Sequence, residues 1–223
     1  MDKLALVNRL LRESGQSFTG VTTTEGRTDE YLKFCDWIDA AYRDILSLHK
    51  TWGFLHDSFS FDTVVGQQEY TRTQAGKVGL KSWLVGDVRS YLADYANEQN
   101  IYFLDWERFK QKYLFGNQRS QTGPPAEFTI KKNKSFAIWP IPDNIYTING
   151  WCYVTGDDMT TDESVPIFDE DYHMIIVWRA LTFYGADYVE ADKYEHGLNE
   201  FRKIKSDMEF HELPELERAE PLC

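Results

Sequence analysis

Apolar residues recur at helical spacing within the first fifty positions of the chain. A first helix is predicted over residues 1–14, and Gly15 is a natural point for it to end. Its apolar positions are Leu4, Val7, Leu10 and Leu11. A second helix is predicted from Thr28, which can cap it, to about Lys50. Its apolar stripe consists of Tyr31, Phe34, Cys35, Ile38, Tyr42 and Ile45.

In the middle of the chain the hydrophobic period changes to two, which is typical of strands. Phe59 and Phe61 alternate with polar residues, and a turn over residues 64–67 brings the chain back through residues 68–70. The other strand-like runs are 80–85, 88–92, 100–103, 128–130, 136–138 and 145–154. Two further elements interrupt this region: a short helix over residues 105–115 capped by Asp105, and a polar loop over residues 116–125 rich in Gly and Pro.

Helical spacing returns after residue 167. The segment 174–186 is apolar nearly all round, so it is buried either in a core or between subunits. A last helix is predicted from about Ala191 to Phe210, with one narrow apolar face. The final residues, 212–223, contain two prolines and are predicted to form an extended tail.

This order of elements predicts an α+β fold. The N- and C-terminal helices are expected to pack as an α-helical bundle, with an antiparallel β domain inserted between them. The pattern leaves open whether the β domain is a sandwich or a barrel. The predicted limits are 1–55 and 160–211 for the bundle, 56–159 for the β domain with its helix at 105–115, and 212–223 for the tail.

The charge of the chain argues against non-specific coating of nucleic acid. Its 223 residues contain 24 Lys and Arg against 36 Asp and Glu, a net charge of −12, whereas coating DNA requires many cations on phosphates. Residues 161–223 hold 16 of the acidic residues and only 6 of the basic ones. The three cysteines lie far apart, which favours a reducing compartment over a disulfide framework.

Neither a membrane span nor a signal peptide is predicted. The longest nearly uncharged run, 174–186, is shorter than the roughly 20 residues that a bilayer crossing needs. Aromatic residues make up 15% of the chain, which fits either a packed β core or a large subunit interface, where Tyr, Trp and Phe are enriched.

The sequence carries no motif that supports an enzyme, a cofactor or a metal site. It lacks the phosphate-binding, zincin and nucleophile-elbow motifs, so no catalytic, cofactor-binding or metal-binding residue is assigned. Asp169 and His173 share helical spacing, as do His196 and Glu200, but surface or interface roles are the stronger interpretation. Cys35 on an apolar stripe is predicted to be a buried structural thiol.

Three lysines sit beside aromatic residues in the predicted hairpin at 128–138. Lys131, Lys132 and Lys134, with Phe128 and Phe136 nearby, superficially suggest binding of single-stranded nucleic acid by base stacking. A hairpin with basic turn residues and inward-facing aromatics is the commoner interpretation.

An ordered series of short segments runs along most of the chain, from about residue 4 to residue 212. The segments are Leu4–Leu11, Asp36–Ile45, Trp52 with Phe54, Ser58–Thr63, Gly66–Tyr70, Leu104–Phe109, Tyr113, Phe115–Gly116, Pro124–Pro125, Trp139–Asp143, Tyr153, His173, Ile175–Leu181 and Tyr184–Gly185, followed by the charged closing helix. In this order the series resembles the head-to-tail adaptor, or connector, proteins of tailed double-stranded DNA bacteriophages. The weight of the resemblance lies in the order of the segments and not in any single motif.

The resemblance implies a non-enzymatic part of the virion. Such adaptors are similar to a helical bundle with an inserted β domain, and they assemble beneath the portal, typically as a twelve-fold ring. The implied partners are the portal protein, copies of the chain itself and downstream neck or tail proteins. Double-stranded DNA would pass through without specific binding, and no membrane would be involved. The implied location is the neck between capsid and tail, after assembly in the host cytoplasm.

Four groups of residues are the candidate contacts of such a ring. Candidate subunit-interface residues are Ile176, Trp178, Phe183 and Tyr184. Candidate acids facing the DNA channel, where they would repel phosphate, are Asp162, Glu163, Asp187, Glu190 and Glu195. Gln118, Arg119 and Gln121 form a candidate tail-docking loop, and Leu213, Leu216 and Leu222 a candidate portal-binding tail.

Two other function classes stay open at this stage. One is another neck protein, such as a tail-completion or minor capsid protein. The other, less favoured, is a carbohydrate-binding module or a small hydrolase that would use the aromatics of the β domain.

Overall fold

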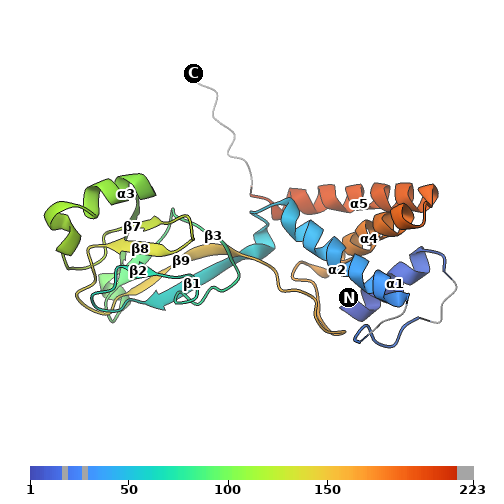
Figure 1. Ribbon diagram of the computed structural model, residues 1–223, viewed down its shortest axis with the longest axis horizontal. Coiled ribbons are helices and arrows are strands. Elements are labelled where there is room, and N and C mark those ends of the chain that lie inside the picture. The colour runs from blue at the N-terminus through green and yellow to red at the C-terminus, as the bar shows by residue number, and fades with distance from the viewer. Residues whose placement is uncertain (17–19, 27–29, 215–223) are drawn as a thin grey trace, which may run out of the picture. The chain divides into compact units, whose positions relative to one another are not determined.

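The computed structural model describes residues 1–16, 20–26 and 30–214, and it divides the chain into two compact units (Figure 1). One unit consists of Met1–Leu55 together with Gly156–Cys223, and the other of His56–Thr155. Thr28, the predicted cap of the second helix, lies outside the described residues. The α+β prediction is confirmed.

The first unit is helical. Its α-helices are α1 (Lys3–Glu13), α2 (Tyr31–Leu48), α4 (Met174–Asp187) and α5 (Ala191–Glu212), with short 3-10 turns η1 (Gly53–Leu55) and η4 (Glu170–Tyr172). Asp2 caps α1, because its carboxylate accepts a hydrogen bond from the amide of Ala5 at 2.8 Å. The first helix ends at Glu13 with Ser14 as its C-cap, and Gly15 follows with a φ of +79°.

The apolar helix α4 lies in the core of the helical unit. It packs against α5, α2 and α1, and Ile175, Ile176 and Leu181 are fully buried. Two glycines allow α4 and α5 to approach closely. A Cβ at Gly185 would lie 2.6 Å from the backbone nitrogen of Tyr194, and one at Gly197 would lie 2.9 Å from the carbonyl oxygen of Trp178.

The second unit consists of two sheets. A five-stranded sheet has the order β1 (His56–Asp62), β9 (Thr147–Val154), β4 (Arg89–Tyr91) and β5 (Gln99–Asn100), with β3 (Leu80–Trp83) also pairing to β9. A four-stranded sheet has the order β2 (Glu69–Tyr70), β8 (Phe136–Trp139), β7 (Glu127–Ile130) and β6 (Tyr102–Phe103). Among the named strands of this fully described unit, β6 and β7 are the one pair that runs in parallel.

The two sheets share one hydrophobic core and do not close into a barrel. Side chains from both sheets meet there, among them Phe59 and Ile148 from one sheet and Phe128 and Phe136 from the other. Within residues 56–155, all of which are described, neither sheet returns onto itself. Of the two alternatives that the sequence left open, the structure therefore excludes the barrel and has two sheets packed as layers.

The pairing of two predicted strands differs from the local pattern. Residues 68–70 do not return beside β1; Glu69 and Tyr70 form β2 and pair with β8 in the opposite sheet. The run 100–103 splits between the two sheets, because Asn100 pairs with Arg89 whereas Tyr102 pairs with Glu127. The local turn signals in the sequence could not show that the chain passes from one sheet to the other at these two places.

The outer face of the four-stranded sheet is covered by α3 (Trp106–Tyr113). Asp105 caps this helix as predicted, accepting from the amide of Arg108 at 3.2 Å. Phe109 and Tyr113 pack with Ala137 of β8, and the ring of Tyr113 stacks on Trp139 with centroids 3.9 Å apart. After α3, the predicted loop forms a 3-10 turn, η3 (Gly116–Ser120).

The basic hairpin β7–β8 is confirmed as a structural element. Phe128 and Phe136 are fully buried between the sheets. The ammonium of Lys131 pairs with Glu69 and lies 4.9 Å from the ring centroid of Trp106. Lys134 donates to the carbonyl of Leu80 at 3.0 Å. The aromatic rings therefore face inward and are not available for stacking with bases.

None of the helices in the described ranges combines the length and the apolar character that crossing a membrane requires.

Candidate interaction surfaces

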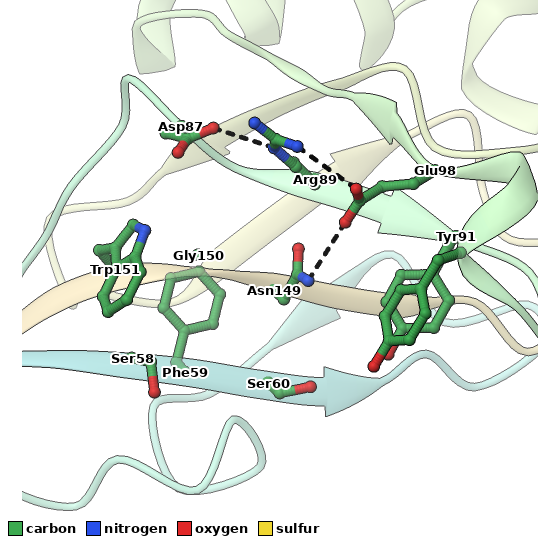
Figure 2. A pocket seen from close by; sticks show the side chains of 11 residues that line it. Ser58, Phe59, Ser60, Asp87, Arg89, Tyr91, Glu98, Asn149, Gly150 and Trp151 are labelled. Carbon is green, nitrogen blue, oxygen red and sulfur yellow. Dashed lines mark hydrogen bonds and ion pairs between the residues drawn. The ribbon is translucent and has the colours of Figure 1, made fainter.

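A groove of about 460 Å³ lies on the outer face of the five-stranded sheet (Figure 2). The strand register places its residues side by side: Ser58 lies opposite Trp151, and Ser60 lies opposite Asn149, which in turn lies opposite Arg89. These residues point away from the core because alternate positions on β1 and β9, such as Phe59 and Ile148, point into it.

The centre of the groove is polar. The guanidinium of Arg89 donates to Asp87 at 3.1 Å and to Glu98 at 3.3 Å, and the amide of Asn149 donates to the other oxygen of Glu98 at 3.5 Å. Asp87 and Glu98 together raise the pKa of Arg89 above its usual value. This network fixes the positions of one cation, two carboxylates and one amide along the groove.

Aromatic rings lie at both ends of the groove (Figure 2). At one end, Trp151 is 43% exposed and stacks on His56, with ring centroids 4.9 Å apart and planes 16° apart. At the other end, Tyr91 packs against Tyr95 at 4.8 Å, and Tyr95 is 73% exposed. The groove therefore offers two ring surfaces on either side of fixed polar groups.

Sequence reasoning did not find this groove. The one signal that could have indicated part of it is Trp151, a large apolar residue at an outward position of an otherwise alternating strand. The remaining residues are brought together by pairing between strands that are distant in sequence.

The predicted subunit-interface residues on α4 divide into two pairs. Ile176 and Tyr184 are 0% and 1% exposed, buried within the helical unit itself. Trp178 and Phe183 keep part of their surface, so only these two can contact a neighbouring molecule without unfolding. Phe183 lies beneath the guanidinium of Arg179, 4.9 Å from its ring centroid.

The candidate channel acids lie in two parts of the helical unit. Asp162 accepts hydrogen bonds from both the amide and the hydroxyl of Thr24, at 2.7 and 2.5 Å, and hydrogen bonds from Thr23 and Thr24 lower its pKa. Asp187 pairs with Lys33 at 2.9 Å. Glu190 accepts from the hydroxyl of Tyr184 at 3.1 Å. The other two members, Glu163 and Glu195, are exposed.

The predicted surface or interface role of His173 is wrong. The residue is 2% exposed, and its ring lies between two backbone groups: Nδ1 is 2.6 Å from the amine of Met1, and Nε2 is 3.0 Å from the carbonyl oxygen of Phe168. Asp169 instead accepts from the amide of Asp171 at 3.0 Å, capping η4. Sequence spacing could not show that the loop before α4 folds over the imidazole.

The other residues considered as reactive or metal-binding groups make structural contacts. Cys35 is buried on the apolar side of α2, as predicted. His196 is exposed and packs edge-on against Trp178, with centroids 5.2 Å apart. Among the described residues, no group of three or more His, Cys, Asp or Glu side chains is placed to hold a metal ion.

Comparison with known protein families shows the family to which the chain belongs. A family model described as "SU10 adaptor protein" matches residues 1–212. The chain belongs to this family. The resemblance to phage head-to-tail adaptors, which rested on an ordered series over residues 4–212, is confirmed. No curated protein matches the chain.

Membership of the adaptor family makes the chain a structural protein of the bacteriophage neck. Within such an adaptor, the two units differ strongly in charge. The helical unit contains 13 Lys and Arg against 26 Asp and Glu, whereas the β unit contains 11 against 10. The net charge of −12 therefore arises from the helical unit alone.

The candidate tail-docking loop of the adaptor is exposed but anchored. Gln118, Arg119 and Gln121 are all exposed. The carbonyl of Gln118 accepts from the indole of Trp139 at 3.0 Å, and that of Gln121 accepts from the amide of Ile141 at 3.0 Å. Its side chains are therefore presented to solvent on a backbone held to the β unit.

The candidate portal-binding tail lies mostly outside the described residues. Leu213 follows α5 and is half-buried, with its amide bonded to the carbonyl of Glu209. Leu216 and Leu222 lie outside the described residues.

Proposed function

We propose that this adaptor assembles as a ring, of twelve copies, beneath the portal at the capsid vertex. The ring extends the DNA channel and provides the surface on which tail components dock. The observation that carries the proposal is the family match over residues 1–212. The proposed role needs no catalytic residue, metal or cofactor, and it locates the chain in the virion neck after assembly in the host cytoplasm.

The charge of the helical unit supports its assignment to the channel. Its 13 excess negative charges would repel the phosphates of a duplex, so DNA would slide past without being held. Glu163 and Glu195 are exposed and could act in this way directly. Asp187 forms an ion pair with Lys33, and Asp162 accepts a hydrogen bond from Thr24, so these two would contribute less.

Contacts between neighbouring copies are proposed at Trp178 and Phe183. Both keep exposed surface, and Arg179 over the Phe183 ring adds a residue type that is enriched in protein interfaces. Arg179 is held by Asp44 at 2.7 Å, which fixes its guanidinium before assembly. A ring requires two different faces on each subunit, and these residues would form part of one of them.

Two segments are proposed to reach other components of the neck. The anchored loop with Gln118, Arg119 and Gln121 would face tail proteins. The tail with Leu213, Leu216 and Leu222 would order on the portal. The loop belongs to the β unit, which carries almost no net charge, so its contacts would not depend on strong long-range attraction.

Native mass spectrometry with and without the purified cognate portal tests the proposal. A monomer that becomes a twelve-copy ring on the portal is the expected result. The variant Phe183→Ala should weaken ring formation, while Tyr102→Ala, an exposed aromatic of the β unit, serves as the matched control.

Other outcomes of this experiment would indicate a different role for the chain. Self-assembly without portal, or binding to the tail tube alone, would indicate a tail-completion protein. A monomer that binds neither component would overturn the proposed ring.

A further inference from the structure

We propose that the groove on the outer face of the five-stranded sheet binds a neutral saccharide chain. This site stands beside the structural role of the adaptor and does not depend on ring formation. The juxtaposition that carries it is a line of fixed hydrogen-bonding side chains with exposed aromatic rings at both ends (Figure 2).

The position of the groove requires recognition by side chains. It lies across the face of β1, β9 and β4, and β9 at its centre pairs with β1 on one side and with β4 on the other. A ligand that lies across this face cannot add as a further strand, because strand addition takes place at a sheet edge, such as the outer edge of β1, and not on the face. Whatever binds must use the rings and the polar side chains on the face of the sheet.

The rings match the shape of a sugar. One face of a pyranose ring is formed by C–H groups, which pack against an aromatic surface, while its hydroxyls project around the rim. One face of the Trp151 ring stacks on the His56 ring, and the Tyr95 ring packs against Tyr91. Rings fixed in this way lose little conformational freedom on binding.

The polar groups between the rings match the rim of hydroxyls. A hydroxyl both donates and accepts, so a sugar can bond to the carboxylates of Asp87 and Glu98 and to the guanidinium of Arg89. The hydroxyls of Ser58 and Ser60 have no protein partner among the described residues and face the groove. Small residues at these two positions also leave room above the sheet.

The charge of the groove selects against polyanions. Two carboxylates and one guanidinium leave one negative charge, which disfavours DNA phosphate and acidic polysaccharides. A proline-rich peptide could pack on the aromatic rings, but each of its residues offers few groups to match the central network. A neutral saccharide can both pack against the aromatic rings and form hydrogen bonds with the central polar network.

The test uses the full-length chain, ¹⁵N-labelled, and the indole N–H signal of Trp151. The probes are maltohexaose, cellohexaose, chitohexaose and an array of neutral bacterial surface polysaccharides. At least one probe should shift this signal in a saturable way. Trp151→Ala should weaken binding of that probe at least tenfold, and Tyr95→Ala several-fold.

Matched controls separate binding from folding. Tyr102→Ala removes an exposed aromatic of the other sheet and should leave binding unchanged. Trp151→Phe, which keeps an aromatic ring, should retain part of the affinity. Circular dichroism and the melting temperature of each variant show whether the β unit is intact.

Three results would overturn the saccharide site: no probe binds at millimolar concentration, Trp151→Ala binds as the parent does, or a decaproline peptide competes better than any saccharide. Ring formation on the portal by Trp151→Ala should be normal. A lost ring with retained sugar binding, or the reverse, would therefore distinguish this inference from the proposed function.

Discussion

The ammonium of Lys3 lies 2.8 Å from Oδ2 of Asp39, and both side chains are largely withdrawn from solvent. Lys3 also donates to the carbonyl of Met159 at 2.8 Å, so one residue of α1 joins α2 to the segment that precedes α4. Burial raises the pKa of the Asp39 carboxyl, and the lysine opposes that rise. The pair thus connects three parts of the helical unit that are far apart in sequence.

Replacing Lys3 by Met should destabilise the helical unit by about 2–3 kcal/mol, because Asp39 would stay buried without its cation. This figure allows for the 25% exposure of the Asp39 side chain. The double variant Lys3→Met with Asp39→Leu should recover most of the loss. Urea unfolding followed by circular dichroism measures both. An exposed pair, Arg43 with Asp158, provides the control, and Arg43→Ala should change stability by less than about 1 kcal/mol.

The buried imidazole of His173 should make stability fall in mild acid. Burial lowers its pKa below the ordinary value of 6.5, and the nearby Met1 amine lowers it further, while the Phe168 carbonyl, Glu170 and Asp169 oppose the shift. A neutral ring is favoured in the folded state. Its contribution is complete above pH 6.5 and is lost as the pH falls towards the lower folded-state pKa.

Melting temperatures between pH 7.5 and 5 test this expectation. The parent should lose stability below pH 6.5, and His173→Gln should show a flatter profile over the same range. His196→Gln changes an exposed histidine and should follow the parent curve. Identical slopes for the parent and His173→Gln would show that another group controls the acid response.

Val189, in the turn between α4 and α5, has a φ of +58° and is 87% exposed. A β-branched residue is strained in this left-handed region, and almost none of its side chain is packed in the subunit. Val189→Gly should therefore raise the free energy of unfolding by about 0.5–1 kcal/mol, since relief of strain outweighs the added backbone freedom. A clear fall in stability would mean that the valine side chain has packing that its exposure does not show.

Deleting residues 213–223 should abolish binding to the portal and leave the helical unit folded. The deletion ends the chain at Glu212, the last residue of α5, so no described helix is shortened. Portal pull-down measures the loss, and circular dichroism with the melting temperature confirms the fold. If the shortened chain binds the portal as the full chain does, the tail is not the contact.

Local periodicity determined the elements of this chain. The positions of α1, α3, α5 and the β7–β8 hairpin follow from spacings of two to four residues and from caps such as Asp105, all of which involve near neighbours. The α+β class follows from the order of those elements. The family resemblance, too, was present in the order of short segments along the chain.

Tertiary structure alone decided which elements meet and which side chains stay exposed. Tyr70 pairs with Phe136 in the opposite sheet, a contact across 66 positions that no local spacing encodes. Ile176 and Trp178 are almost adjacent in one apolar helix, yet only Trp178 keeps exposed surface, because packing by α1, α2 and α5 surrounds α4 unequally. The groove of Arg89, Glu98 and Trp151 exists only because β9 pairs with strands on both sides. Burial and pairing depend on distant residues, so they become definite only when the chain is folded.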